Sequence, residues 1–206
     1  YQSPVWQSEK RFYNYNWYAS ILLHELERRL DRNTGGTSQL AEHDSLLVIN
    51  ELELIYGRYP ALRPAAPDLS RSGLLMEVRE LKDNFLFMRS LAAQAKDSAL
   101  ITGRKAMGEA AFERLREREQ NDALADLVKR KESYRYYRET GDRLIRLYAP
   151  VYKEPESETG DAHFYAADKT VMGYSVETPW FNTAVIWLQG LVLYFVLLFN
   201  IPSRLR

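Results

Sequence analysis

The sequence predicts an all-α fold: a helical bundle or hairpin with a coiled-coil-like seam, then an irregular segment and one C-terminal transmembrane helix. Two observations carry this prediction. Apolar residues recur at helical spacing between residues 74 and 99, and residues 180–201 include no Asp, Glu, Lys or Arg. We therefore expect four parts: an extracytoplasmic helical domain over 1–149, an irregular or extended segment over 150–179, the transmembrane helix over 180–201, and a cytoplasmic stub over 202–206.

The composition suits one folded domain plus an anchor. Lys and Arg together number 28, as do Asp and Glu, so the chain of 206 residues has no net charge. A neutral chain lacks the basic footprint of nucleic-acid binding. The absence of cysteine excludes disulfides and thiol chemistry. An apolar share of 46% is ample for a core, which argues against a disordered chain.

The first half of the chain predicts two helices. Residues 1–13 show no clear pattern, but one helical face from residue 14 to residue 30 carries Ala19, Leu23, Leu26 and Leu30. Residues 33–36 should break this helix. A second helix is expected from Thr37 to Tyr56, with an apolar stripe of Leu40, Leu47, Val48, Leu52, Leu54 and Ile55. Gly57 fits the position just past its end, and residues 60–67 read as a proline-rich linker.

The third helix has the clearest pattern outside the membrane segment. Asp68 is a suitable cap, and apolar residues follow at alternating steps of four and three. They form a predicted seam of Leu74, Val78, Leu81, Phe85, Met88, Ala92, Ala95 and Ala99. The small alanines at its end would let a neighbouring helix approach closely.

Residues 102–148 stay helical in character but become heavily charged. We expect a long helix or a helical hairpin, with a break near residues 121–122 and a second irregularity at Gly141. Two thin apolar stripes and two ion pairs one turn apart support it, namely Met107, Ala111 and Leu115; Leu124, Leu127 and Val128; Asp126–Arg130; and Glu139–Arg143. Pro150 should end this helix, and residues 151–179 look extended, with a short hairpin expected within 163–174.

The apolar stretch 180–201 is predicted to span a membrane. As a helix it would be about 33 Å long, which matches a hydrocarbon core of about 30 Å. Thr178 can cap its first turn, and Pro179 suits the first helical position. The alternative is the buried core helix of a soluble protein, but such helices seldom stay apolar on every face. Gln189 and Gly190 suggest that the helix packs against another membrane helix, unless the amide is simply tolerated on an isolated anchor.

The predicted anchor and packing residues are Trp180, Phe181, Trp187, Gln189, Gly190, Tyr194, Arg204 and Arg206. The first two would lie in an interfacial aromatic belt, and the two arginines would form a cytoplasmic positive flank. This orientation places residues 1–179 outside the cytoplasm. The chain begins with Tyr and shows no signal-peptide pattern, so we expect it to be a fragment of a larger membrane protein.

Catalytic and cofactor motifs are not recognisable. His24-Glu25 would need a second histidine at position 28 to make a zinc-protease motif, and that position is Arg. The other histidines, His43 and His163, are scattered. There is no GxxxxGK[ST] loop for nucleotide phosphates. Tyr134, Tyr136 and Tyr137 interleave with Arg135 and Arg138 as in a nucleic-acid stacking strip, but packing at a half-wet helix interface explains them better. We therefore assign no catalytic, cofactor or metal residue.

The last 45 residues resemble a known family. They carry His163, Phe164, Tyr165 and Ala166, then Glu177, then Trp180, Phe181 and Asn182, then Val185, Ile186, Trp187 and Leu188. This run resembles the C-terminus of ABC transporters from Bacteroidetes-type bacteria, which fuse an ATP-binding cassette to an ABC-2 (ABCG-like) permease. Residues 16–19 (Asn-Trp-Tyr-Ala) echo the segment after that family's penultimate helix. The cassette is outside this chain, so the resemblance implies ATP and Mg²⁺ for the parent protein only.

The resemblance implies the large extracytoplasmic loop and final helix of an exporter in a bacterial inner membrane. Its implied partners are the lipid bilayer, other membrane helices of the same protein, a second copy in a homodimer and a periplasmic protein; nucleic acid is not expected. Two alternatives stay open. One is a single-pass, membrane-anchored helical adaptor, and the other is an enzyme whose helical site has no recognisable motif.

Overall fold

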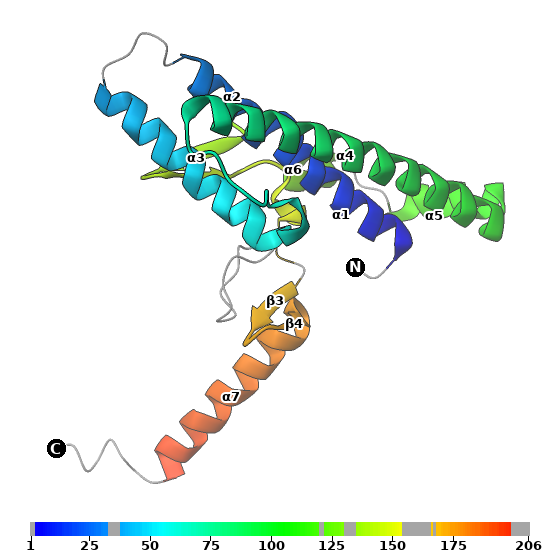
Figure 1. Cartoon of the computed structure of the whole chain (residues 1–206). Helices are drawn as coiled ribbons and strands as arrows, with labels where there is room; N and C mark the ends of the chain where they lie inside the picture. The colour runs from blue at the N-terminus through cyan, green and yellow to red at the C-terminus, as the bar shows by residue number, and fades with distance from the viewer. Residues whose placement is uncertain are drawn as a thin grey trace. The chain divides into compact units, whose positions relative to one another are not determined.

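The computed structural model describes residues 3–32, 38–119, 122–129, 135–153, 166 and 168–198 (Figure 1). Within these ranges, the side chains of residues 38–42, 119, 122, 124, 127 and 128 are not described. The chain divides into an N-terminal unit, residues 1–150, and a C-terminal unit, residues 151–206. The structure is mostly α-helical, which confirms the predicted fold class.

A continuous helical rod opens the N-terminal unit. It consists of α1 (Pro4–Trp17), the π-helical turn η1 (Tyr18–Leu22) and α2 (Leu23–Arg32). The Ser3 side chain accepts from the Trp6 N–H at 3.1 Å, and Pro4 takes the first helical position. The predicted start at residue 14 was therefore wrong by ten residues. The Ser-Pro start signal was present, but α1 lacks a clear apolar stripe, and periodicity alone missed it.

The second helix is α3 (Ser38–Arg58), followed by the 3-10 turn η2 (Pro60–Leu62) within the predicted linker. The predicted break at 33–36 and the start at Thr37 lie outside the described residues. Gly57 does not end the helix, because Tyr59 N–H still donates to the Ile55 carbonyl. Leu47, Val48, Leu52 and Ile55 are buried as predicted. Leu54 is exposed instead, because a straight helix drifts away from a strict seven-residue repeat.

The predicted seam lies on α4 (Arg71–Met107), whose cap is Ser70 and not Asp68. The Ser70 hydroxyl accepts from Gly73 N–H, while the Asp68 carboxylate accepts from Ser70 N–H. The seam is confirmed over most of its length: the buried members are Leu74, Val78, Leu81, Phe85 and Ala92, with Met88 and Ala99 half-buried. Ala95 is exposed, again because the 3.5-residue repeat drifts against 3.6-residue helix geometry.

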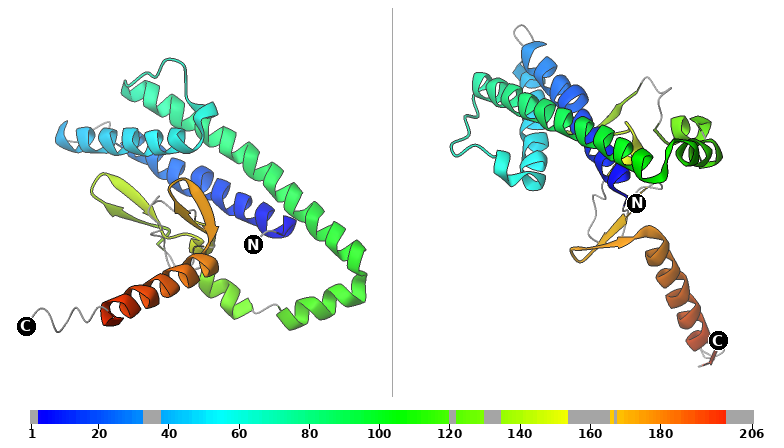
Figure 2. Two further views of the ribbon diagram at one scale, coloured as in Figure 1. Left: turned by 90° about the horizontal axis from the view of Figure 1, so that it is seen from below. Right: turned by 90° about the vertical axis from the view of Figure 1, so that its right-hand side faces the viewer.

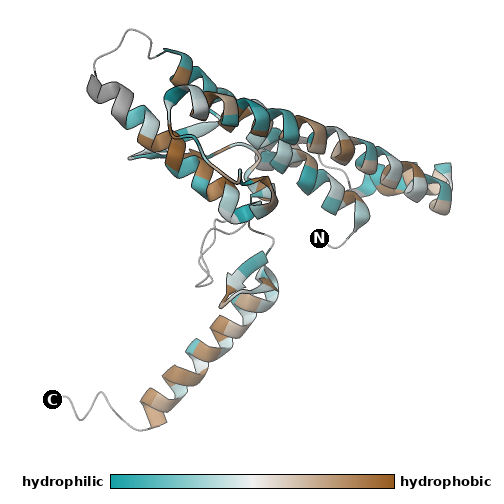
Figure 3. Ribbon diagram, viewed as in Figure 1, coloured by the Kyte–Doolittle hydropathy of each residue, from teal (hydrophilic) through white to brown (hydrophobic). Residues whose placement is uncertain are grey.

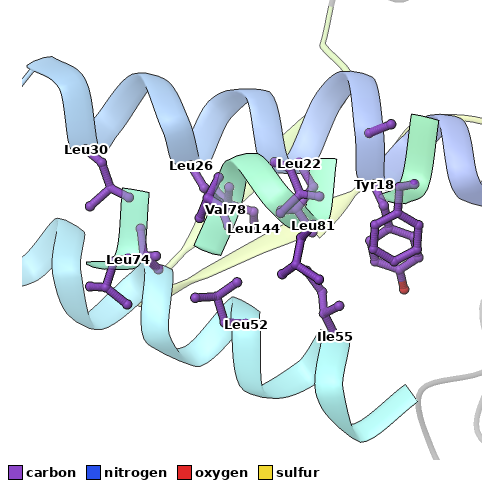
Figure 4. Packing of buried hydrophobic residues seen from close by; sticks show 14 of the residues in the cluster. Tyr18, Leu22, Leu26, Leu30, Leu52, Ile55, Leu74, Val78, Leu81 and Leu144 are labelled. Atoms are coloured by element: carbon purple, nitrogen blue, oxygen red, sulfur yellow. The ribbon is translucent and has the colours of Figure 1, made fainter. Parts of the chain in front are cut away.

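The core lies between three helical layers. α4 runs antiparallel along the rod of α1, η1 and α2, and α3 packs beside them (Figures 1 and 2). Figure 4 shows leucines from the rod, α3 and α4 meeting around Val78, with Leu144 from a strand behind them. At one end of this core the Tyr18 ring stacks on Phe85 with centroids 4.7 Å apart.

The charged stretch after α4 differs from the prediction. Gly108, at φ +80°, ends α4, and α5 (Glu109–Glu119) and α6 (Asp122–Lys129) follow. The predicted break near residues 121–122 falls at the α5–α6 junction, where residues 120 and 121 are outside the description. The predicted thin stripe of Met107, Ala111 and Leu115 is divided between the end of α4 and α5, and its three residues are exposed and form no buried face. The side chains of Leu124, Leu127 and Val128 are not described.

A β-hairpin replaces the predicted helical end of this stretch. Strand β1 (Tyr137–Thr140) pairs antiparallel with β2 (Arg143–Arg146), with Tyr137 opposite Arg146. Gly141 occupies the turn at φ +61°, a conformation that glycine adopts freely. The predicted one-turn pair Glu139–Arg143 therefore does not form; Glu139 instead binds Arg29 of α2 at 2.6 Å. Arg130, the other predicted partner, lies outside the described residues.

The C-terminal unit holds a second hairpin and the apolar helix. After η3 (Pro150–Tyr152), strand β3 (Asp168–Val171) pairs antiparallel with β4 (Tyr174–Glu177). The turn residues Met172 and Gly173 both have positive φ, as in a type I′ hairpin. The hairpin thus ends three residues later than predicted, and residues 163–165 are not described. Helix α7 (Thr178–Leu198) follows β4 directly.

Candidate membrane anchor

Helix α7 has the length and composition of a membrane span. Within its 21 residues, an 18-residue window has a mean hydropathy of 1.8, and none of that window is buried within the protein. At about 1.5 Å per residue the helix is roughly 32 Å long, close to a hydrocarbon core of about 30 Å. Figure 3 shows it predominantly apolar, with a few polar bands. The buried-core-helix alternative does not fit, because such a helix would have a covered face; α7 therefore indicates membrane association.

The entry to α7 is fixed by local contacts. The helix begins at Thr178, two residues earlier than predicted, so Thr178 is its first residue and not a preceding cap. Its hydroxyl donates to the Ala166 carbonyl at 2.7 Å, which ties the helix start to the chain before β3. The Lys169 ammonium of β3 lies 4.6 Å from the Phe181 ring centroid. A cation over an aromatic ring at a helix end suits a membrane–water interface.

Most of the predicted anchor residues are exposed, as side chains that contact lipid would be. Trp180 is 69% exposed and Trp187 is 75% exposed, while Phe181 is half-buried beside Lys169. Tyr194 packs edge-on against Phe195, with centroids 5.7 Å apart. Arg204 and Arg206 lie outside the described residues. The predicted end at residue 201 does too, since α7 is described as far as Leu198.

The polar and small residues of α7 gather on one face. Asn182 and Gln189 are seven residues apart, as are Thr183 and Gly190, so all four lie within about one third of the helix circumference. A side chain placed at Gly190 would meet nothing within 4 Å. In lipid, small and amide residues mark faces where another helix packs. Our sequence reasoning found Gln189 and Gly190 but missed Asn182 and Thr183, although the spacing of seven was visible.

In the N-terminal unit, described residues line at least two hollows. The larger, about 860 Å³, lies between α1, the end of α4, α5 and α6, and its lining mixes apolar side chains such as Leu100 and Phe112 with Lys96, Arg104 and Asp97. The smaller, about 500 Å³, is lined by charged α2 and α4 residues such as Glu27 and Lys82. Glu27 already binds Lys82 and Arg79, each at 2.7 Å. Neither lining shows a nucleophile with an adjacent base.

The buried carboxylates hold the fold together and do not face a hollow. Burial raises the pKa of Glu25, but hydrogen bonds from Arg28 and Arg29 outweigh it, so the pKa lies below its ordinary value. Glu51 accepts from the Leu144 backbone N–H at 2.7 Å. A low-pKa, ion-paired carboxylate is a poor proton acceptor at neutral pH. Within the described ranges, no three His, Asp or Glu side chains form a metal-binding group.

The Tyr-Arg strip is part of the β1–β2 hairpin region and not of a helix. Tyr137 packs against the core, and the Tyr136 ring meets Tyr148 at 5.9 Å; Tyr134 is outside the described residues. Across the hairpin, Arg146 donates to Asn14 of α1 at 2.7 Å. These contacts support the packing interpretation. They also reveal a polar network between hairpin and helices that sequence spacing alone did not show.

No family model matches this chain, and no curated protein or solved structure is significantly similar to it. The resemblance of residues 162–206 to ABC-2 exporters therefore stays a prediction.

Proposed function

We propose that this chain is the extracytoplasmic helical domain and final transmembrane helix of an ABC-2-type exporter. The observation that carries the proposal is α7, a span-length apolar helix that has no buried residue and directly follows the β3–β4 hairpin. The resemblance of residues 162–206 to ABC-2 exporters supports the assignment of the chain to this class of transporter. ATP and Mg²⁺ would bind to the cassette elsewhere in the parent protein.

In this proposal α7 works by packing and not by chemistry. The face with Asn182, Gln189 and Gly190 would lie against other membrane helices of the same protein, because amide groups are costly in lipid when unpaired. Lys169 and the belt of Trp180 and Phe181 would lie at the outer interface, and Arg204 and Arg206 at the cytoplasmic one. The C-terminus would then lie in the cytoplasm of a bacterial inner membrane.

The N-terminal unit would cover the exit of the transport path or dock a periplasmic protein. Its core joins three helical layers with a hairpin, and its buried carboxylates are ion-paired or bonded to backbone N–H groups. Such a unit can transmit a mechanical change between membrane helices without binding a cofactor. Its role in transport is thus structural and recognitive.

The mass of the native polypeptide tests the exporter proposal. An antibody raised against residues 3–32 should detect, in native membranes, a protein of several domains, far above the 24.1 kDa of this chain. A native species close to 24.1 kDa would overturn the proposal and leave a membrane-anchored adaptor.

Cysteine labelling tests the topology separately, since the chain has no native cysteine. Ser175→Cys on the exposed part of β4 should react with a membrane-impermeant maleimide in spheroplasts. A matched Ser203→Cys variant should react only after the membrane is permeabilised. The reverse labelling pattern would invert the proposed orientation.

A further inference from the structure

Helix α4 carries a second apolar face opposite its core seam. Met76, Phe87, Leu91 and Ile101 are 70%, 63%, 48% and 54% exposed. At about 100° per residue they fall within an arc of roughly 80°, while Phe85 and the rest of the seam point the other way. Figure 3 shows apolar segments recurring along α4 between polar ones. Phe87 and Leu91 are one turn apart and form the centre of this exposed apolar row, whose burial would require a partner that lies along the same face.

The polar residues of this outer face are arranged by charge. Glu80 and Asp83 lie toward the start of α4, and Lys105 lies near its end, all of them exposed. Gln94 and Ser98 occupy the same face between Leu91 and Ile101. Acidic residues at one end and a basic residue at the other make the face complementary to itself when a second copy runs antiparallel.

The positions fit a two-fold pair. Glu80 and Lys105 are equally far from the midpoint between Leu91 and Gln94, so an antiparallel partner places the two charges opposite each other. The same symmetry sets Phe87 against the small Ser98 and Ile101 against Asn84. These steps alternate by three and four along the helix, which is the spacing of a coiled-coil seam. From Glu80 to Lys105 the contact would be about 38 Å long at roughly 1.5 Å per residue.

We propose that the outer face of α4 binds the same face of a second copy of this chain, with the two α4 helices antiparallel. Symmetric pairing is the commonest form of self-association, and its interface uses one patch twice. The pairing uses the N-terminal unit alone and does not depend on the exporter proposal. It names a partner surface that is separate from the packing face of α7.

Single cysteines in the full chain, kept in its membrane, test the pairing. In the antiparallel pair the two residues 94 are offset by about 4.5 Å along the axis and the two residues 98 by about 16 Å; with axes about 8 Å apart, the α-carbons are then roughly 6 Å and 17 Å apart. Two cysteines whose α-carbons are more than about 7 Å apart cannot be bridged. Gln94→Cys should therefore form a disulfide-linked dimer at twice 24.1 kDa under mild oxidation, and Ser98→Cys should not. Equal cross-linking at both sites, or none at residue 94, would overturn the proposal.

Charge reversal tests which ends meet. In the Gln94→Cys background, Lys105→Glu should lower the cross-linking yield by about threefold, a modest loss because exposed ion pairs contribute little. Adding Glu80→Lys and Asp83→Lys should restore the yield, since the partner charges are then reversed together. Because these side chains are exposed, the helical circular dichroism should stay unchanged in every variant. Failure of the reversed set to recover the yield would rule out the antiparallel arrangement.

Discussion

Leu46 and Leu47 are neighbours in α3 with opposite environments: Leu46 is 52% exposed and Leu47 is fully buried in the core. Leu47→Ala should lower the free energy of unfolding by about 2–5 kcal/mol, because it removes buried apolar surface and leaves a cavity. Leu46→Ala should change it by less than about 0.5 kcal/mol, as most surface substitutions do. Thermal unfolding of the full chain in detergent, followed by circular dichroism, measures both. Equal losses would contradict the core packing described for α3.

Glu51 joins α3 to the β1–β2 hairpin through its hydrogen bond from the Leu144 N–H. Glu51→Ala should cost about 1–3 kcal/mol, because the buried N–H loses its acceptor. Glu51→Gln keeps a carbonyl oxygen of nearly the same shape and should cost less. Amide hydrogen exchange at Leu144 reports the bond directly, and we expect it to speed up in Glu51→Ala. Unchanged exchange in that variant would show that Glu51 does not hold the strand.

At the scale of elements, sequence periodicity predicted the helices that bury one apolar face. It missed helices that have no such face. The α4 seam was found because Leu74, Val78, Leu81 and Phe85 repeat at a period that packing on one partner requires. α1 was missed because its buried residues include Ser8 and Asn14, whose burial depends on distant contacts. The order of the first three helices could thus be predicted from the sequence, but the residue at which the rod begins could not.

The β1–β2 hairpin is a second element that periodicity did not predict. Its turn, Gly141-Asp142, is a pair that commonly closes hairpins, so a local signal existed. We read the segment as a helix because its charges suited one-turn pairs such as Glu139–Arg143. Two contacts hold the segment as a hairpin against the helices: Glu139 with Arg29, and Leu144 with Glu51. Each joins residues about one hundred positions apart in the sequence. Spacing rules describe neighbours and cannot reveal such pairs.

The docking of this hairpin should depend on pH. Hydrogen bonds from Arg29 are the main cause that holds the pKa of Glu139 below its ordinary value of 4.5. Because the folded pKa is the lower one, this contribution to stability is present above pH 4.5 and is lost as pH falls through the folded pKa. We expect unfolding temperature to drop in acid for the wild type, with a shallower drop for Glu139→Gln. Arg29→Gln should give a drop at least as shallow, because Arg29 also helps to lower the pKa of Glu25; wild-type steepness in both variants would contradict the role of this pair.

For the whole molecule, the two candidate surfaces differed in how far sequence revealed them. α7 was found almost completely, because a run of apolar residues is a property of one segment and needs no partner. The outer face of α4 was missed: helical spacing separates Phe87 and Ile101 from the seam, but only their exposure in the structure shows that this second face is uncovered. The contact of Lys169 with Phe181 was missed for a similar reason, since it requires the β3–β4 hairpin.

Anchoring of the chain should depend on the middle of α7. Leu188 lies near its centre and is 63% exposed, so its side chain would face lipid or another helix. Leu188→Arg should oppose insertion by about 3 kcal/mol, equivalent to roughly a hundredfold change in the equilibrium. The variant of this chain should then appear in the supernatant after alkaline extraction of membranes, whereas the wild type and Leu188→Phe should stay in the pellet. Retention of Leu188→Arg at the wild-type level would mean that α7 is not what holds the chain to the membrane.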